Sequence, residues 1–290
     1  MSQKLVGYAY LTSAMVLVGS TVIASKIIGA GLEPFTAAAL RFAIALPFLV
    51  ALMRMSGAPW PRPGRRDAVL LLIQSTAGSV GYTALLISGL RLTSAADAGV
   101  IIGTLPVVSA AIAILILGER PRPVVLFAIG LAAVGVFAIA AQFPDGAPAS
   151  LLGNALIFAA VLCEGLFILL SKRLAVPVPP LAQSTLMTGI GLVVALLPAA
   201  FEWPSMAGAT PGAVAAVVYY ALVPTVGGYL LWYGGLARVS GAEASLFTAM
   251  APVSAVLLAV ILLGEAVSFS QMIGVACVLL AVLSLGLARK

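Results

Sequence analysis

The sequence predicts an all-α integral membrane protein of ten transmembrane helices, arranged as two inverted five-helix repeats. Three observations support this fold class: an apolar composition, ten stretches of membrane-spanning length, and a resemblance between the two halves. Hydrophobic residues make up 62% of the chain and charged residues only 8%. Soluble domains carry about 25% charged residues because their surfaces meet water, so most of this surface must face lipid.

Ten stretches qualify as transmembrane helices, since a spanning helix needs roughly 20 mostly apolar residues. Barrel strands would be about half as long and would alternate in polarity. We interpret the first stretch as a retained helix, because it lacks the small-residue cleavage site of a signal peptide. The predicted helices cover residues 5–29, 34–55, 67–90, 94–117, 121–142, 151–173, 180–201, 210–237, 241–263 and 268–288.

Lysine and arginine gather on one side of these helices. Cytoplasmic loops of membrane proteins carry the excess of these residues. With the N-terminus in the cytoplasm, alternation places twelve basic residues inside and only two, Lys26 and Arg91, outside. We therefore expect both termini in the cytoplasm. The net charge of +6 then reflects membrane orientation rather than nucleic-acid binding.

The two halves resemble each other at a constant offset of 146 residues. Residues 89–119 and 235–265 match at 11 of 31 positions without gaps. A glycine of the first helix obeys the same offset, because Gly7 corresponds to Gly153.

This repeat predicts two domains, 1–145 and 146–290, of five helices each. An odd number of helices turns the second half upside down in the membrane. Inverted repeats are characteristic of secondary transporters, which bind substrate near the midplane between the halves. A duplicated membrane scaffold or sensor without transport is the alternative, because a fold alone does not establish a function.

Three kinds of motif stand out, and two of them, the Pro-Val and Gly-Glu pairs, occur at equivalent places in the two halves. The Gly-Glu pairs that end the fourth and ninth helices are followed by the glycine-rich fifth and tenth helices. The motifs are the run from Pro34 to Arg41-Phe42 that opens the second helix, the pairs Pro106-Val107 and Pro252-Val253, and the pairs Gly118-Glu119 and Gly264-Glu265 that end the fourth and ninth helices.

On these motifs the chain resembles the ten-helix, EamA-repeat transporters of the drug/metabolite transporter superfamily, over essentially its whole length. Within that superfamily it is most similar to bacterial amino-acid exporters of the YddG type. The resemblance implies a central cavity lined by helices 1–4 and 6–9, with helices 5 and 10 behind. It also implies export of amino acids or related metabolites across the bacterial inner membrane, without a cofactor.

Polar and aromatic side chains recur at helical spacing on several predicted helices. Such stripes are often plain helix interfaces, but hydroxyls mixed with amphipathic rings would suit a wet pocket for amino-acid-sized solutes. The candidate cavity residues are Thr12, Met15, Gln74, Ser75, Ser79, Tyr82, Glu164, Thr225, Tyr229, Trp232, Phe247 and Met250.

Three charged residues need separate interpretations. Glu164 lies about 20 Å along helix 6, where an acid either contacts a substrate ammonium or couples protons, or else pairs with a basic residue near the inner interface. For Arg41 we favour a structural role; it either snorkels to the outer interface or faces the cavity as an anion contact or a partner for an acid. Lys26 opposes the charge bias, which makes it a candidate for the outer mouth.

Paired prolines and acids lie in the fourth and ninth helices. Pro106 and Pro252 each remove a backbone hydrogen bond near the midplane, so we expect hinges there; inert kinks are the alternative. Asp97 and Glu243 each follow a serine by three residues, which is the pattern of a capping box. We expect these two acids to cap helices rather than to share acid–base chemistry.

Other functional classes lack their motifs. No Gly-Lys dipeptide exists for a phosphate-binding loop, so no ATPase drive or ATPase subunit is implied. The chain has no histidine and no Gly-x-Ser-x-Gly elbow, which argues against an intramembrane enzyme. Cys163 and Cys277 form no metal or disulfide pattern. The expected partners are a small-molecule substrate and the lipid bilayer.

Overall fold

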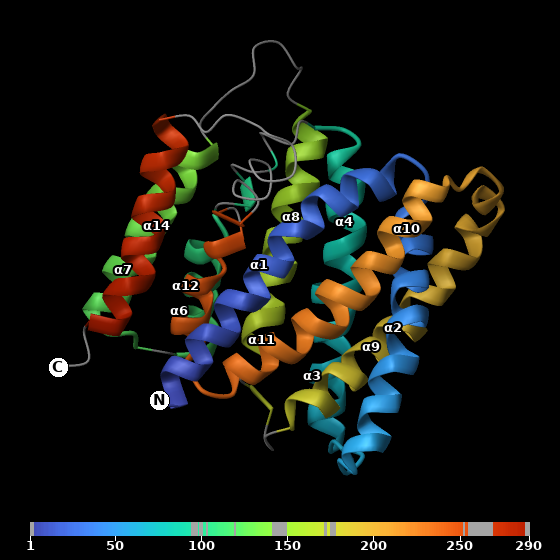
Figure 1. The fold of residues 1–290 in the computed structure, drawn as a ribbon, viewed down its shortest axis with the longest axis horizontal. Helices are drawn as coiled ribbons and strands as arrows, with labels where there is room; N and C mark the ends of the chain where they lie inside the picture. The colour runs from blue at the N-terminus through green and yellow to red at the C-terminus, as the bar shows by residue number, and fades with distance from the viewer. Residues whose placement is uncertain are drawn as a thin grey trace.

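The computed structural model consists of helices and their connections throughout the part of the chain that it describes, without a β-strand there (Figure 1). Pro252, Asp97 and Lys172 lie outside the described residues. The structure describes residues 3–93, 98, 101–102, 104–118, 120–140, 150–170, 173–174, 178–251, 253–254 and 269–287.

The first half contains long helices that match the predicted stretches. The third predicted stretch is a continuous helical segment that changes from α-helical to π-helical geometry and back to α-helical geometry. The helices are α1 (Gln3–Gly29), α2 (Pro34–Ser56), α3 (Arg65–Ser75), the π-helical η1 (Thr76–Gly81), α4 (Tyr82–Leu90), α6 (Leu105–Leu117) and α7 (Pro123–Ala140).

The second half repeats this order. Its helices are α8 (Leu151–Leu170), α9 (Pro180–Glu202), the short 3₁₀ helix η3 (Trp203–Gly208), α10 (Pro211–Tyr220), the π-helical η4 (Ala221–Gly227), α11 (Gly228–Leu236), α12 (Gly241–Phe247) and α14 (Phe269–Leu287).

Six of the described helical stretches are long and apolar enough to cross a membrane. The total of ten crossings therefore stays a prediction. The six stretches are Gln3–Gly29, Pro34–Ser56, Arg65–Leu90, Leu151–Leu170, Pro180–Gly208 and Pro211–Leu236.

The ends of α2 show how the sequence sets helix boundaries. Pro34 occupies the first turn, where its missing N–H is not needed. At the other end Gly57 takes a positive φ of 63°, and its N–H donates to the Arg54 carbonyl oxygen. A left-handed glycine is a common helix stop because it lacks the Cβ that this conformation penalises.

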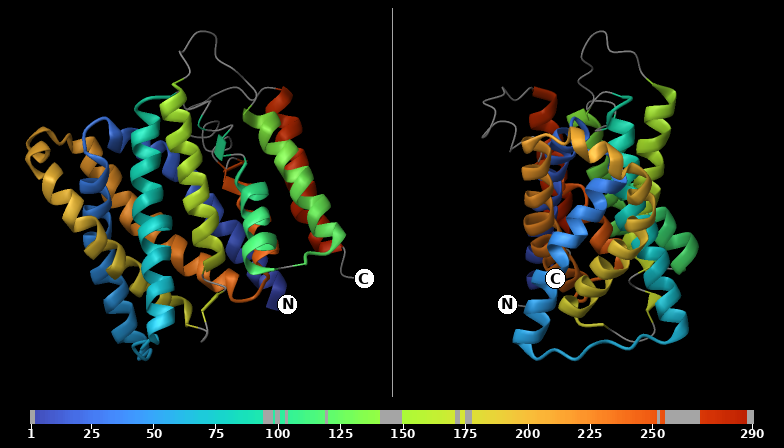
Figure 2. Two further views of the ribbon diagram at one scale, coloured as in Figure 1. Left: turned by 180° about the vertical axis from the view of Figure 1, so that it is seen from behind. Right: turned by 90° about the vertical axis from the view of Figure 1, so that its right-hand side faces the viewer.

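The packing of the helices follows the internal repeat. α1 packs on α10 and α11 of the second half, and α8 packs on α3 and α4 of the first. α2 packs on its own counterpart α9, and α7 packs on its counterpart α14. Figures 1 and 2 show α7 and α14 side by side at one end of the molecule.

Glycines that revealed the repeat lie at the two equivalent crossings. A Cβ added to Gly235 would lie 2.9 Å from the Gly7 carbonyl oxygen, where α11 crosses α1. A Cβ added to Gly89 would lie 3.2 Å from the Gly153 carbonyl oxygen, where α4 crosses α8. These helix pairs therefore approach closely because neither partner carries a side chain at the crossing.

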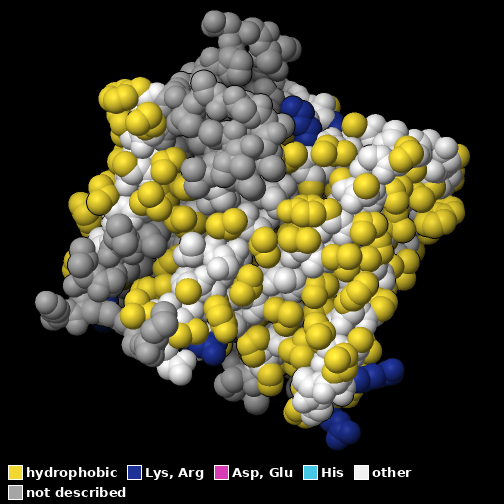
Figure 3. Space-filling view, viewed as in Figure 1, with side chains coloured by type: hydrophobic (Ala, Val, Ile, Leu, Met, Phe, Trp, Pro, Cys, Tyr) yellow, Lys and Arg dark blue, Asp and Glu magenta, His cyan; other side chains and the backbone are white. Residues whose placement is uncertain are grey.

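The surface is apolar across its middle. In the face shown in Figure 3, hydrophobic side chains cover the centre, while lysines and arginines gather near the lower edge, with another group near the upper edge. The start of α1, the end of α14 and the α2–α3 connection lie toward the same end of the molecule (Figure 1). This arrangement suits a body whose middle faces lipid and whose ends meet water.

Candidate functional site

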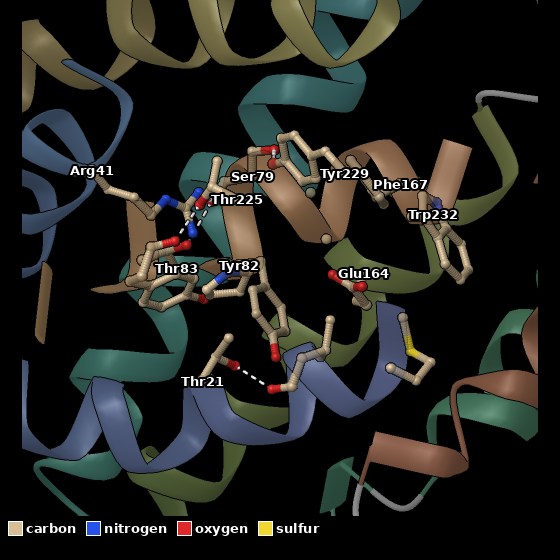
Figure 4. Close-up of a pocket in the computed structure, with 16 residues that line it drawn as sticks. Thr21, Arg41, Ser79, Tyr82, Thr83, Glu164, Phe167, Thr225, Tyr229 and Trp232 are labelled. Carbon is tan, nitrogen blue, oxygen red and sulfur yellow. Dashed lines mark hydrogen bonds between the residues drawn. The ribbon is translucent and has the colours of Figure 1, made fainter. Parts of the chain in front are cut away.

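A cavity lies between the two halves, with walls from four segments of each. α1, α2, η1 and α4 contribute from the first half, and α8, α10, η4 and α11 from the second. Its volume is about 60 Å³, which is room for roughly four to six waters at ~10–15 Å³ each. The lining, shown in Figure 4, comprises Met15, Val18, Thr21, Arg41, Gly78, Ser79, Tyr82, Thr83, Glu164, Phe167, Tyr220, Pro224, Thr225, Gly228, Tyr229 and Trp232.

Two π-helical segments, η1 and η4, form part of this wall. They correspond to each other under the 146-residue offset of the repeat. Pro224 of η4 has no N–H to continue an α-helix. In η1, a Cβ added to Gly81 would lie 3.0 Å from the Thr76 carbonyl oxygen, so the tight turn needs glycine there. Isolated π-helical turns are rare and are frequently found at functional sites.

Arg41 brings a buried positive charge to the cavity. The residue is only 5% exposed, and its guanidinium carbon lies 4.3 Å from the ring centre of Phe42 and 4.7 Å from that of Tyr220. One terminal nitrogen lies 3.5 Å from the Ser79 carbonyl oxygen. Its Nε has no hydrogen-bond partner among the described residues. The burial overturns snorkelling to the interface, because the charge is not in water.

Glu164 brings a negative charge to the same cavity from α8. Its side chain is half-buried, and neither a hydrogen bond nor an ion pair holds its carboxylate within the described part of the chain. Arg41 and Glu164 enter the cavity from opposite sides of the view in Figure 4, and they form no ion pair with each other. Among the described residues, Glu164 therefore does not form the pairing with a basic residue that the sequence left open.

Hydroxyls and aromatic rings complete the wall. The Ser79 hydroxyl and the Tyr229 hydroxyl share a hydrogen bond across the two halves. The Phe167 ring stacks against the Tyr229 ring, with centroids 6.0 Å apart. The indole Nε1 of Trp232, which is 4% exposed, has no acceptor among the described residues. The wall thus offers donors and amphipathic rings beside the two charges.

The structure places the sequence-predicted cavity residues in two groups. Those that line the cavity are Met15, Ser79, Tyr82, Glu164, Thr225, Tyr229 and Trp232. Those that do not line it are Thr12, Gln74, Ser75, Phe247 and Met250.

The second group has other contacts. Gln74 Nε2 donates to the Phe167 carbonyl oxygen at 2.8 Å, and Ser75 Oγ donates to the Met187 carbonyl oxygen at 3.0 Å. Both residues precede η1, where i→i+5 bonding adds a residue to the turn. A spacing of four residues therefore no longer keeps Ser75 and Ser79 on one face.

Phe247 and Met250 belong to the apolar core around α12. The Phe247 ring packs on the Tyr8 ring with centroids 5.0 Å apart. Thr12 is half-buried on α1 and is absent from the lining. For these residues helical spacing indicated a helix interface, as amphipathic stripes commonly do.

Several lining residues were missed by the sequence reasoning. Thr21 and Val18 extend the α1 face that Met15 begins, at intervals of three residues, and this spacing could have identified them. Phe167 follows Glu164 by the same interval on α8. Tyr220 carried no signal in the sequence, because its place in the wall follows from the bend at η4.

Lys26 and the capping acid Glu243 lie outside the cavity. Pro106 is the second residue of α6, and a turn at Thr104 precedes that helix. Lys26 is exposed near the end of α1. Glu243 makes the predicted capping box, since Glu243 N donates to Ser240 Oγ at 3.1 Å and Ser240 N donates to Glu243 Oε2 at 2.9 Å.

The wall also differs from the helix set that the family resemblance implies. Lining residues come from the first, second, third, sixth and eighth predicted helices. Within the described chain, α6, α9 and α12 contribute none of them. No group of three or more Cys, Asp and Glu residues that could hold a metal ion occurs among the residues described.

Comparison with known proteins independently identifies the family and the fold of this chain. The model of the EamA-like transporter family matches the chain twice, over residues 5–141 and 151–287. A solved structure with 22% sequence identity has the same fold, with a TM-score of 0.78, and the alignment covers 99% of this chain and 97% of the other.

Curated relatives are also named as transporters. The uncharacterized transporter YetK of Bacillus subtilis is 35% identical over 89% of this chain and 80% of its own length. A probable terminal-alkyne amino-acid exporter of Streptantibioticus cattleyicolor is 28% identical over 70% of this chain and 68% of its own length. The family model covers most of the chain in two copies, so this multi-pass membrane protein belongs to the EamA-like transporter family.

Proposed function

We propose that the protein exports amino acids or closely related metabolites across the bacterial inner membrane by alternating access. In this proposal ten crossings form two inverted halves, both termini are cytoplasmic, and the cavity between the halves is the substrate site. Secondary transporters with inverted repeats commonly bind substrate at such a midplane site and expose it to each side in turn.

The observation that carries the proposal is the pair of opposite, unpaired charges in one cavity. Neither Arg41 nor Glu164 has an ion-pair partner within the described residues. Charged groups inside a membrane protein are costly, and they commonly mark substrate or ion pathways. An amino acid carries a carboxylate and an ammonium group, so it can complement both charges at once.

The arginine is well suited to the carboxylate. A planar guanidinium offers a fork of donors that matches a carboxylate in a bidentate arrangement, and the Nε of Arg41 is free to take part. The rings of Phe42 and Tyr220 hold the guanidinium in place. Glu164 then receives the substrate ammonium from α8, in the other half of the chain.

The small volume of the cavity implies that its wall moves during transport. A volume of about 60 Å³ holds a few waters but not an amino acid. The walls must therefore separate to admit substrate, which alternating access provides. The amino-acid exporter among the relatives supports this substrate class, since its name describes the cargo of a similar chain.

The test is counterflow of labelled amino acids in liposomes that contain only this protein, with and without a pH gradient. The variants are Arg41→Gln and Glu164→Gln, and the control is Arg54→Gln, an exposed arginine on the same helix α2. A charge-assisted hydrogen bond contributes about 1.5–3 kcal/mol, so each cavity variant should weaken apparent affinity by about tenfold or more.

Substrate analogues separate the two roles. If Arg41 binds the carboxylate, the wild-type protein should prefer an amino acid to the corresponding amine, and Arg41→Gln should lose that preference. If Glu164 binds the ammonium, Glu164→Gln should lose the preference over the corresponding des-amino acid. Unchanged preferences in both variants would remove the charge pair as the substrate site. Absence of any counterflow by a folded wild-type protein would refute amino-acid transport itself.

A further inference from the structure

A second, larger pocket lies apart from the central cavity, where three segments meet at one end of the bundle. The start of α1, the α6–α7 connection and the turn before α12 form its walls. Its volume is about 410 Å³, against about 60 Å³ for the central cavity. Lys4, Arg120, Pro121, Arg122, Val125, Ser240 and Glu243 line it.

The acid of this pocket is already neutralised. Glu243 Oε1 accepts hydrogen bonds from Lys4 Nζ at 2.9 Å and from the Tyr8 hydroxyl at 3.0 Å. Its other oxygen accepts from Ser240 N at 2.9 Å. The charges of Glu243 and Lys4 therefore neutralise each other, and Glu243 has little capacity left to repel or bind another ligand.

Two arginines remain without partners. Arg120 and Arg122 are exposed, and neither side chain forms a hydrogen bond or an ion pair within the described residues. The lining carries three positive charges and one negative charge, which leaves a net charge of +2. A guanidinium offers a fork of N–H donors to a phosphate, so two of them in a pocket of this net charge favour a phosphate ligand.

The chain holds these arginines in a stiff segment. Residues 120–123 read Arg-Pro-Arg-Pro, so each arginine precedes a proline. Proline fixes its own φ and restricts the residue before it to extended conformations. A stiff segment loses less conformational freedom on binding, so the two guanidiniums are partly preorganised.

The internal repeat shows that this arginine pair is not a duplicated structural feature. Under the 146-residue offset, Arg120 corresponds to Ala266 and Arg122 corresponds to Ser268. The repeat therefore carries no basic residue at the equivalent positions of the second half. The pair belongs to one end of the bundle only.

The pocket lies beside an apolar, exposed helix face. Leu126 follows Arg122 by four residues, which places it one turn farther along the same side of α7. Leu126 is 45% exposed and Phe127 is 67% exposed. Acyl chains attached to a phosphate at Arg122 could run along this face. A soluble anion would make no use of it.

We propose that this pocket binds the phosphate headgroup of an anionic membrane lipid, with Arg120 and Arg122 as its ligands. The basic loops of a membrane protein face the leaflet side rich in anionic headgroups, and basic pockets between helices are known to bind them. Lys4 and Glu243 shape the floor of the site, while the exposed face of α7 receives the acyl chains.

The experiment measures binding of fluorescent phosphatidylglycerol to the purified full-length protein in detergent. The variant is the double substitution Arg120→Gln with Arg122→Gln. The matched control is Arg65→Gln with Arg66→Gln, an exposed basic pair at the start of α3 that does not line the pocket. All four residues are exposed, so the variants should fold, and thermal unfolding checks this.

We expect the pocket variant to bind phosphatidylglycerol at least tenfold more weakly and the control to bind it as the wild type does. Zwitterionic phosphatidylcholine should bind more weakly than phosphatidylglycerol to the wild type and to the control, but not to the pocket variant. Equal loss in both variants, or unchanged affinity in the pocket variant, overturns the proposal. Displacement of the lipid by equimolar inorganic phosphate also overturns it, because the free ion would then be the better ligand.

Discussion

The crossing of α11 over α1 allows a quantitative test of the packing. In Gly235→Ala the new Cβ would lie 2.7 Å from Leu11 Cγ and 2.9 Å from the Gly7 carbonyl oxygen. The second contact is with backbone, so the helices must separate rather than a side chain rotate. Overpacking of this kind costs about 1–3 kcal/mol.

A matched substitution isolates that cost. Gly130 lies within α7, is exposed, and has no atom within 4 Å of an added Cβ. Glycine to alanine within a helix stabilises by about 0.5–1 kcal/mol through backbone entropy, and both variants share this gain. The difference in unfolding free energy between Gly235→Ala and Gly130→Ala should therefore be about 1–3 kcal/mol.

Thermal unfolding in detergent, followed with a thiol-reactive dye, can measure the difference because Cys163 and Cys277 are half-buried free thiols. At roughly 2–4 °C per kcal/mol, Gly235→Ala should melt roughly 2–12 °C below Gly130→Ala. Gly89→Ala, at the equivalent crossing of α4 and α8, should behave like Gly235→Ala. Equal midpoints in all three variants would refute close helix contact at these glycines.

Three further predictions concern topology, hinges and capping. Cysteines introduced for Asp145 and Ser205 should be labelled from outside the cell, and cytoplasmic labelling at either would contradict the inverted halves. Pro106→Ala and Pro252→Ala should each leave the protein folded yet slow counterflow, with opposite biases in cysteine accessibility; wild-type rates in both would make the prolines ordinary kinks. Glu243→Ala should lower unfolding free energy by about 1–2 kcal/mol through loss of the hydrogen bonds that the carboxylate accepts from Ser240 N, Lys4 and Tyr8, whereas Glu243→Gln should cost less because glutamine also completes a capping box.

Much of the fold could be predicted because its signals are local or repeated. Proline and glycine mark the ends of helices: Pro34 begins α2, and Gly57 ends it. The offset of 146 residues also pairs the glycines that the structure places at the two helix crossings. Gly7 and Gly235 match Gly153 and Gly89 in the other half, and both pairs lie where helices touch.

The candidate site was harder to predict, because side-chain direction depends on tertiary context. The stripe through Ser75 and Ser79 assumed an unbroken α-helix, and the π-helical η1 between them changes which face each residue occupies. From its spacing alone, the Arg41 side chain could point either to the outer interface or into the cavity. Its place inside the cavity depends on packing against Tyr220, a residue 179 positions away in the chain (220 − 41).

The repeat and the charges together suggest how the site works. Equivalent segments η1 and η4 build matching parts of the wall, but the charges do not follow the symmetry. Under the offset, Arg41 corresponds to Met187 and Glu164 corresponds to Val18. The cavity wall is therefore partly symmetric in its backbone, through η1 and η4, and dipolar in its charge. A dipolar substrate would lie in it in one orientation, held by one half at its carboxylate and by the other at its ammonium. Rocking of the halves would then carry the substrate across without reversing it.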